Sequence, residues 1–87
     1  MFSKLIENYI KNLNKNDIIN YSKNEHINLN EDEVDIIYNT IKNDYKILLY
    51  DDSTNIFNNL KSRINPTSYT KIKYLFDSYK EKYKKYL

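Results

Sequence analysis

The stretch "NLNEDEVDIIYNTIKNDYKILLY", residues 28–50, decides how the chain folds, because a strong helix start leads into an ambiguous apolar run. Asn30 is a good N-cap residue, and Glu33, three positions on, completes the pattern of a capping box. Apolar residues at helical spacing follow and predict one buried helix face: Val34, Ile37, Tyr38 and Ile41. At the far end the side chains alternate as in a strand, so we expect a short extended segment at residues 45–50 that crosses the core.

Two further helices are predicted on the N-terminal side of this stretch. Residues 2–13 carry one apolar stripe at spacings of three and four, formed by Phe2, Leu5, Ile6, Tyr9, Ile10 and Leu13. Asn14 and Asp17 approximate a second capping box, which starts a short helix that ends near Asn24.

Two more helices are predicted on the C-terminal side. Asp51 or Asp52 caps a helix that must stop before Pro66, because the residue before proline disfavours helical backbone. Asn65 as N-cap and Pro66 at the first helical position start a last helix that runs to the end of the sequence. Its apolar seam has heptad spacing: Tyr69, Ile72, Phe76, Tyr79, Tyr83 and Tyr86. The expected fold class is therefore all-α, a small five-helix bundle with a long C-terminal helix.

Composition restricts the class of protein. The 87 residues are enough for one domain with a modest core, and 40% apolar against 30% charged residues is a globular balance. Cysteine is absent, which excludes disulfides and thiolate metal sites and makes the cytoplasm the default location. Asn, Lys, Ile and Tyr supply 49 positions while glycine and alanine supply none, a bias typical of an AT-rich genome. Without glycine, we expect Asn or Asp wherever a loop needs positive φ.

Helix lengths predict an overhang at the C-terminal end. The last helix, at about 20 residues, should reach roughly 30 Å, whereas predicted helices of about 11 to 13 residues reach roughly 17 to 20 Å. We therefore expect residues 1–78 to form the bundle core of a single domain, with residues 79–87 projecting past it.

The cap and core spacing of residues 14–79, "NKNDIINYSKNEHINLNEDEVDIIYNTIKNDYKILLYDDSTNIFNNLKSRINPTSYTKIKYLFDSY", resembles the YqfT-like family of small uncharacterised proteins found in bacilli. The shared pattern is a capped short helix, an "I-x-L" connector, a second capped helix, an apolar crossing segment and two more helices. A basic "RGK"-type turn that commonly precedes the crossing in that family is replaced by "NDYK", residues 43–46. The resemblance implies a helical fold and a bacterial origin, and no activity.

Nothing in the sequence predicts an enzyme, a cofactor site or a metal site. An acidic group, formed by Glu31, Asp32, Glu33 and Asp35, falls in the first turn of a predicted helix, where carboxylates complement the exposed N–H groups. His26 is the only histidine and has no cysteine, second histidine or activated serine to act with it. We expect a non-enzymatic protein.

The C-terminal region suggests two kinds of binding. Residues 71–87 hold six lysines against Asp77 and Glu81, net +4, whereas residues 1–70 are net −2. The leading hypothesis is protein interaction, either as a homodimer or with an unknown partner, because aromatic residues are enriched at interfaces. The alternative is nucleic-acid binding by stacked tyrosines and phosphate-contacting lysines, although Arg63 is the single arginine. Both use the same candidate residues: Tyr79, Lys80, Lys82, Tyr83, Lys84, Lys85 and Tyr86.

Two other interpretations stay open. The last turns can simply be frayed and solvated, since the genome favours Tyr and Lys. Membrane association through residues 2–13, flanked by Lys4, Lys11 and Lys15, is disfavoured because a five-helix core needs that apolar stripe.

Overall fold

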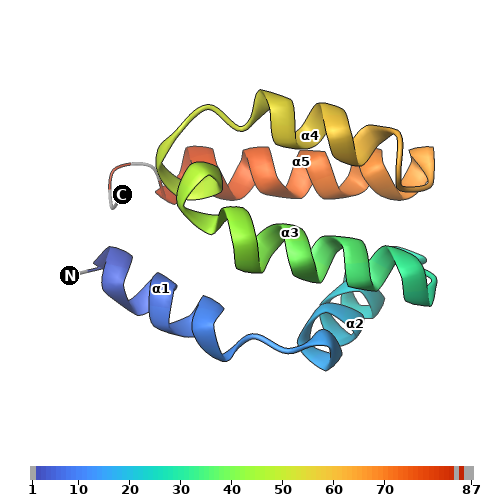
Figure 1. Ribbon diagram of the computed structural model, residues 1–87, viewed down its shortest axis with the longest axis horizontal. Coiled ribbons are helices and arrows are strands. Elements are labelled where there is room, and N and C mark those ends of the chain that lie inside the picture. Colours follow the sequence, from blue (N-terminus) through green and yellow to red (C-terminus); the bar gives the residue numbers. More distant parts are fainter. Residues whose placement is uncertain (1, 84, 86–87) are drawn as a thin grey trace.

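The computed structural model describes residues 2–83 and 85, and within them the chain forms five α-helices and no strand. The helices are α1 (Phe2–Asn12), α2 (Lys15–Asn24), α3 (Glu31–Tyr50), α4 (Thr54–Lys61) and α5 (Pro66–Tyr83). In Figure 1, α3 runs through the middle, with α4 and α5 on one side of it and α1 and α2 on the other. The predicted all-α bundle is confirmed.

Local capping sets the start of two helices as predicted. At α2, the Asn14 side chain accepts from the N–H of Asp17 (2.9 Å), and the Asp17 carboxylate accepts from the N–H of Asn14 (3.0 Å). The same reciprocal pair joins Asn30 and Glu33 at α3, at 2.8 and 3.0 Å. Each box satisfies two N–H groups that a helix start otherwise leaves without partners.

The extended segment expected at residues 45–50 is wrong, because α3 continues as a helix through Tyr50. Leu48 and Leu49 are adjacent and both half-buried, while Ile47 is 40% exposed, which is the burial pattern of a helix and not of an alternating strand. No glycine or proline interrupts the run, so the core-facing stripe of α3 extends past Ile41. A short apolar run has no periodicity that distinguishes a helix from a strand.

The α4 and α5 starts are also fixed by short polar side chains. Asp52 accepts from the backbone N–H and the hydroxyl of Thr54, the first residue of α4, although Ser53 occupies the N-cap position without a side-chain capping bond. Asn65 accepts from the N–H groups of Thr67 (2.9 Å) and Ser68 (3.4 Å), as expected for the N-cap of a helix that begins with proline.

The loop between α2 and α3 contains the one positive φ among the described residues, and His26 adopts it (φ 58°). The expectation that Asn or Asp would take such a position is wrong here. Histidine is also enriched in the left-handed region, though less tolerant than glycine. The turn brings the buried Ile27 against the core directly after α2 ends.

The core lies where α2, α3, α4 and α5 meet. Its buried apolar residues are Ile18, Val34, Ile37, Phe57, Leu60 and Ile64. Phe57 packs its ring against Phe76 of α5, with centroids 4.8 Å apart, and against Tyr69 at 6.4 Å. No described side chain falls below 2% exposure, so the core is shallow, as a chain of this size requires.

One buried carboxylate ties the starts of two helices together. Glu33 is 7% exposed, and the oxygen that does not serve the α3 capping box accepts from the backbone N–H of Asn65 at 2.6 Å. Beside it, the buried Ser68 hydroxyl donates to the carbonyl of Asn28 at 2.8 Å. These bonds fix the α4–α5 turn against the beginning of α3.

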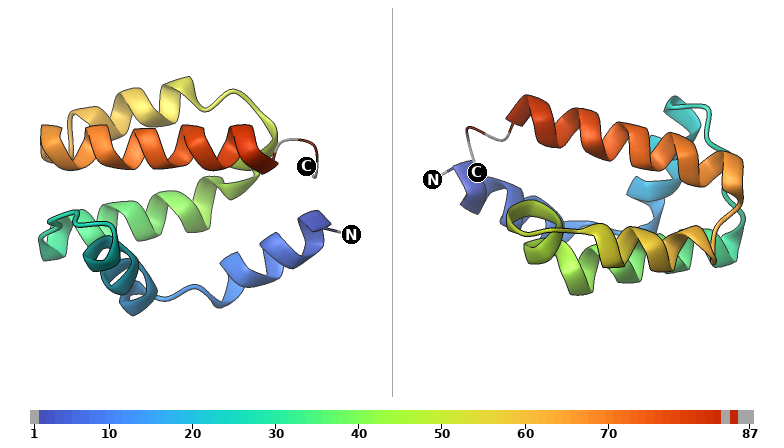
Figure 2. Two further views of the ribbon diagram at one scale, coloured as in Figure 1. Left: turned by 180° about the vertical axis from the view of Figure 1, so that it is seen from behind. Right: turned by 90° about the horizontal axis from the view of Figure 1, so that it is seen from above.

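The premise of the predicted overhang is wrong. With 20 residues, α3 spans about 30 Å, and α5, with 18 residues, spans about 27 Å. The C-terminal half of α5 therefore has α3 beside it, and α1 begins at the same end of the molecule where α5 ends (Figures 1 and 2). Tyr79 and Tyr83 face residues of their own chain, whereas Lys84 and Tyr86 lie outside the described residues.

Candidate interaction surface

Tyrosines from three helices meet on one face of the bundle. The Tyr21 hydroxyl of α2 donates to the Tyr79 hydroxyl of α5 at 3.0 Å. The Tyr79 and Tyr83 rings are stacked, with centroids 6.3 Å apart and an interplanar angle of 16°. Tyr9 of α1 lies close enough to Tyr21 for its charge, when ionised, to raise the pKa of Tyr21. We call this surface, completed by Leu5 one turn before Tyr9, the tyrosine face.

The Tyr21 phenol of this face stays neutral at physiological pH. The pKa of Tyr21 is raised above the ordinary value for tyrosine, first by burial, next by its hydrogen bond to Tyr79, and further by the charges of Tyr79, Glu25 and Tyr9. A neutral phenol donates and accepts hydrogen bonds and also presents a large apolar ring. The tyrosine face is therefore amphipathic and uncharged at its centre.

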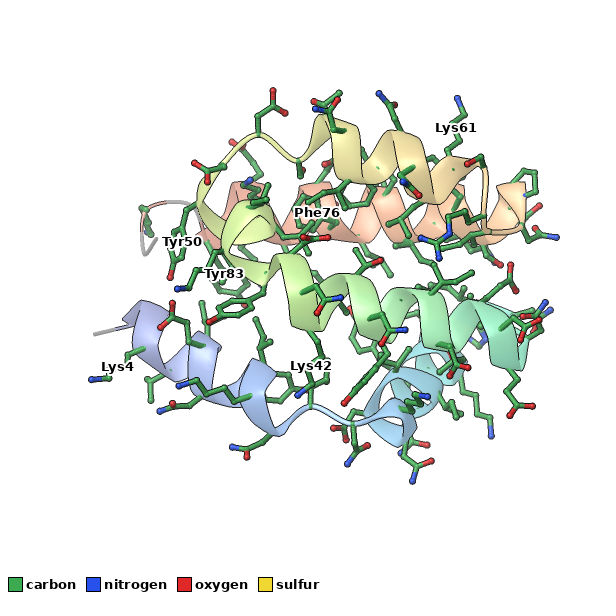
Figure 3. All side chains as sticks on the ribbon, in the orientation of Figure 1. Lys4, Lys42, Tyr50, Lys61, Phe76 and Tyr83 are labelled. Atoms are coloured by element: carbon green, nitrogen blue, oxygen red, sulfur yellow. The ribbon has the colours of Figure 1, made fainter. Side chains whose placement is uncertain are left out.

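A small apolar hollow of about 140 Å³ opens beside these rings. It is lined by Ile6 of α1, Leu48 and Leu49 of α3, and Phe76, Tyr79, Lys80 and Tyr83 of α5. Figure 3 places Tyr83 at the end of the molecule where α1 begins and α3 ends. The α1 helix packs along α3, and its residue Ile6 lines the hollow together with the α5 side chains.

The tyrosine face exposes much of its apolar surface. Leu5 is 63% exposed, Tyr9 66%, Tyr21 44% and Tyr79 43%. At ~200 Å² for a tyrosine, these side chains together leave roughly 400 Å² in contact with solvent, within the size range of surface patches that are often functional.

Sequence reasoning found only the α5 part of this face. Tyr79 and Tyr83 belong to it, and Lys82 lies at its edge, with its ammonium 5.4 Å from the centroid of the Tyr83 ring. Lys80 extends away from Lys82 toward the end of α3, where its ammonium donates to the carbonyl of Asp51 at 3.0 Å. Lys85 is described and exposed, while the candidates Lys84 and Tyr86 lie outside the described residues.

Three residues of the tyrosine face were missed: Leu5, Tyr9 and Tyr21. Leu5 and Tyr9 were counted in the buried stripe of the first helix, yet only the Ile6 and Ile10 side of that stripe is half-buried. The width of the apolar stripe was the signal that part of it would stay exposed. One neighbouring helix cannot cover apolar residues that are spread over so much of a helix circumference.

The lysines of α5 do not form one basic surface. Lys71 donates to the carbonyl of His26 at 2.8 Å, and Lys73 forms an ion pair with Asp77 at 2.7 Å. Together with Lys80 and Lys82, they contact different neighbours around the helix. This spread agrees with the absence of a single lysine stripe in the sequence.

A second, polar hollow of about 280 Å³ lies at the start of α5. Its lining residues are His26, Asn28, Asn65, Thr67, Ser68 and Lys71. The N–H groups of the first turn are already bound by the Asn65 side chain, and the Lys71 ammonium is held by the His26 carbonyl. The Ser68 hydroxyl donates to the carbonyl of Asn28, so both the hydroxyl and the ammonium in this lining are bound by backbone carbonyls and not by the His26 ring.

Two acidic residues of α3, Glu33 and Asp35, serve structure. Glu33 caps two helix starts, and Asp35 pairs with Lys15 at 2.8 Å, which raises the pKa of the Lys15 ammonium through their hydrogen bond and opposite charges. In residues 2–83 and 85, no three His, Cys, Asp or Glu side chains come together in a way that could hold a metal ion. Nor does any helix of the described part combine the length and apolarity needed to cross a membrane.

Comparison with known proteins identifies a family and no activity. Searches of curated proteins and of solved structures find no match to this chain. A family model matches residues 1–80, which include the first four helices, most of α5 and the tyrosine face as far as Tyr79. The chain therefore belongs to the family described as "Protein of unknown function (DUF2624)".

Proposed function

We propose that this chain is a non-enzymatic protein-interaction module that binds its partner through the tyrosine face. The observation that carries the proposal is that Tyr21 of α2 joins the stacked Tyr79 and Tyr83 of α5 beside an apolar hollow. Ile6 of α1 lines the same hollow, and the neighbouring Leu5 and Tyr9 of that helix are exposed. Tyrosine is enriched at interfaces because a rigid ring buries much area while its hydroxyl keeps a hydrogen bond.

The position of these rings distinguishes them from isolated exposed residues. Tyr74 of α5 is 71% exposed but lies about 140° around the helix from Tyr79, away from the other exposed tyrosines. Scattered apolar residues are normal on any protein surface. A connected group that several helices position together favours an interface.

The proposal modifies the interaction surface expected from sequence. The C-terminal helix still contributes, through Tyr79, Tyr83 and the neighbouring Lys82, but as one wall of a surface that α1 and α2 complete. Nucleic-acid binding has less support, because Lys71, Lys73 and Lys80 of α5 each contact a different neighbour and form no single basic surface. Catalysis has less support, since the Ser68 hydroxyl and the Lys71 ammonium, which share the polar hollow with His26, both donate to backbone carbonyls.

We also propose the cellular setting that the sequence suggests. The bias toward Asn, Lys, Ile and Tyr and the lack of cysteine support a bacterial cytoplasm and an AT-rich genome. The resemblance to the YqfT-like proteins of bacilli supports the same origin.

Site-specific photo-crosslinking tests the proposed surface. A benzophenone analogue of phenylalanine replaces Tyr9 in one variant and Tyr74 in a matched control; both sites are aromatic and similarly exposed, at 66% and 71%. After irradiation in cells of the source organism, position 9 should give a discrete protein adduct, identified by mass spectrometry, and position 74 should not.

Either of two results refutes the proposal. One is the absence of any discrete adduct from positions 9, 21 and 79 in protein that circular dichroism shows to be folded. The other is an adduct that nuclease treatment removes, which would establish the nucleic-acid alternative.

A further inference from the structure

We propose that the partner is a second copy of this chain, docked face to face through the tyrosine face about a two-fold axis. This inference rests on the proposed function and names its partner. In such an isologous dimer each copy presents the same surface, so the surface must be complementary to itself.

The exposed area of the tyrosine face supplies about half of one partner's share of an ordinary dimer interface. A standard interface takes about 800 Å² from each partner, of which roughly 56 to 65% is apolar. The tyrosine face supplies roughly 400 Å² of mostly apolar surface. Polar neighbours at its edge, among them Asn8, Asn12 and Lys82, are exposed and can supply the remainder.

Two residues, Glu25 and Lys82, place opposite charges at the two ends of the face. Glu25 caps the end of α2 one turn after Tyr21, and its backbone N–H donates to the Tyr21 carbonyl at 3.0 Å. Lys82 lies in the last turn of α5, over the Tyr83 ring. Figure 1 shows that the end of α5 and the end of α2 lie toward opposite ends of the molecule.

A two-fold axis through the centre of the face brings these ends together. Tyr9, Tyr21 and Tyr79 then pack near the axis, and the Glu25 end of each copy lies over the Lys82 end of the other. Two equivalent ion pairs result, and they fix the antiparallel orientation. Lys71 also lies toward the Glu25 end, where its ammonium is held by the carbonyl of His26.

Charge reversal with sedimentation equilibrium tests this arrangement on the full chain. The unmodified protein should show a concentration-dependent monomer–dimer equilibrium. Glu25→Lys or Lys82→Glu should each weaken dimerisation roughly tenfold or more, because each turns two attractive pairs into two repulsive ones. Lys61→Glu on α4, which makes the same change in net charge as Lys82→Glu but away from the face, should leave the dissociation constant within about twofold (Figure 3).

Mixing the two variants gives the most specific result. In a heterodimer of Glu25→Lys and Lys82→Glu, both pairs are again attractive, so an equimolar mixture should recover the affinity of the unmodified protein. Circular dichroism of each variant excludes unfolding as the cause of lost dimerisation.

Failure of the dimer and failure of the proposed function are distinguishable. A chain that is monomeric at every soluble concentration, or reversals that do not differ from Lys61→Glu, overturns the dimer. If position 9 then captures a different protein, the interaction surface stands. If positions 9, 21 and 79 all capture nothing, both proposals fall.

Discussion

Replacing Glu33 with alanine should destabilise the fold far more than a typical helix-cap mutation. The buried carboxylate accepts from Asn30 at 3.0 Å and from Asn65 at 2.6 Å. Hydrogen bonds to charged groups contribute about 1.5 to 3 kcal/mol each, so losing both should cost about 3 kcal/mol or more. For 87 residues the whole free energy of unfolding is roughly 4 to 13 kcal/mol, so this loss is a large part of it.

The chain contains a matched control for that substitution. Asp17 occupies the same position in the α2 capping box and bonds the N–H of Asn14 at 3.0 Å, but this bond is exposed. Asp17→Ala should therefore cost about 1 kcal/mol. The difference between the two variants, about 2 kcal/mol, measures the bond from Glu33 to the α4–α5 turn.

Urea denaturation followed by circular dichroism measures both losses. With a urea dependence of about 1 to 3 kcal/mol per molar for a small protein, Glu33→Ala should lower the midpoint by between about 1 and 3 M. Glu33→Gln keeps the size of the side chain but turns one acceptor into a donor, so it should lie between the two alanine variants. Equal midpoint shifts for Glu33→Ala and Asp17→Ala would refute the reasoning, because the bond to Asn65 would then contribute nothing.

Two further predictions concern the elements that form the tyrosine face. Tyr79→Phe removes the acceptor of the Tyr21 hydroxyl, so the pKa of Tyr21 should fall toward its ordinary value of 10.0; alkaline titration followed by tyrosine-ring NMR checks this, and an unchanged pKa contradicts it. The folded state holds the Tyr21 proton more tightly than the unfolded state does, so the protonated Tyr21 hydroxyl stabilises the fold. This stabilisation is complete below pH 10 and is lost as the pH rises through the raised pKa of Tyr21. Lys42 donates to two carbonyls in the last turn of α1, both at 2.8 Å, so Lys42→Met should speed amide hydrogen exchange in α1 severalfold at a cost of about 1 kcal/mol; unchanged exchange there would contradict the role of Lys42.

The elements that sequence predicted well are those decided by a few neighbouring residues. Asn14 with Asp17 and Asn30 with Glu33 form capping boxes from spacing alone, and Asn65 before Pro66 starts α5. Each device is complete within four residues, so no knowledge of the rest of the fold is needed.

The elements that sequence missed depend on distant contacts. The local sequence could not decide whether residues 45–50 were helical. A run of adjacent apolar residues suits a helix or a strand until the elements that pack against it are known. The second bond of Glu33 reaches Asn65, 32 residues away, and no short-range pattern announces it. The sequence therefore indicated the cap but not the link between helices.

The candidate surface was only partly predictable for the same reason. The sequence pointed to Tyr79 and Tyr83 because α5 was expected to be longer than the other helices. That expectation is wrong, since α3 has 20 residues and α5 has 18. What makes them a surface is the approach of α1 and α2, shown by the bond from Tyr21 to Tyr79 across 58 residues. Helical periodicity identifies the faces of single helices, but not which faces of different helices come together.

Crosslinking from position 9, compared with position 74, addresses the proposed interaction surface most directly, since the two sites differ little in exposure and lie on different faces. We predict a discrete protein adduct from position 9 and none from position 74. Equal capture from positions 9 and 74, or no capture from positions 9, 21 and 79, would show that the exposed tyrosines form no binding surface.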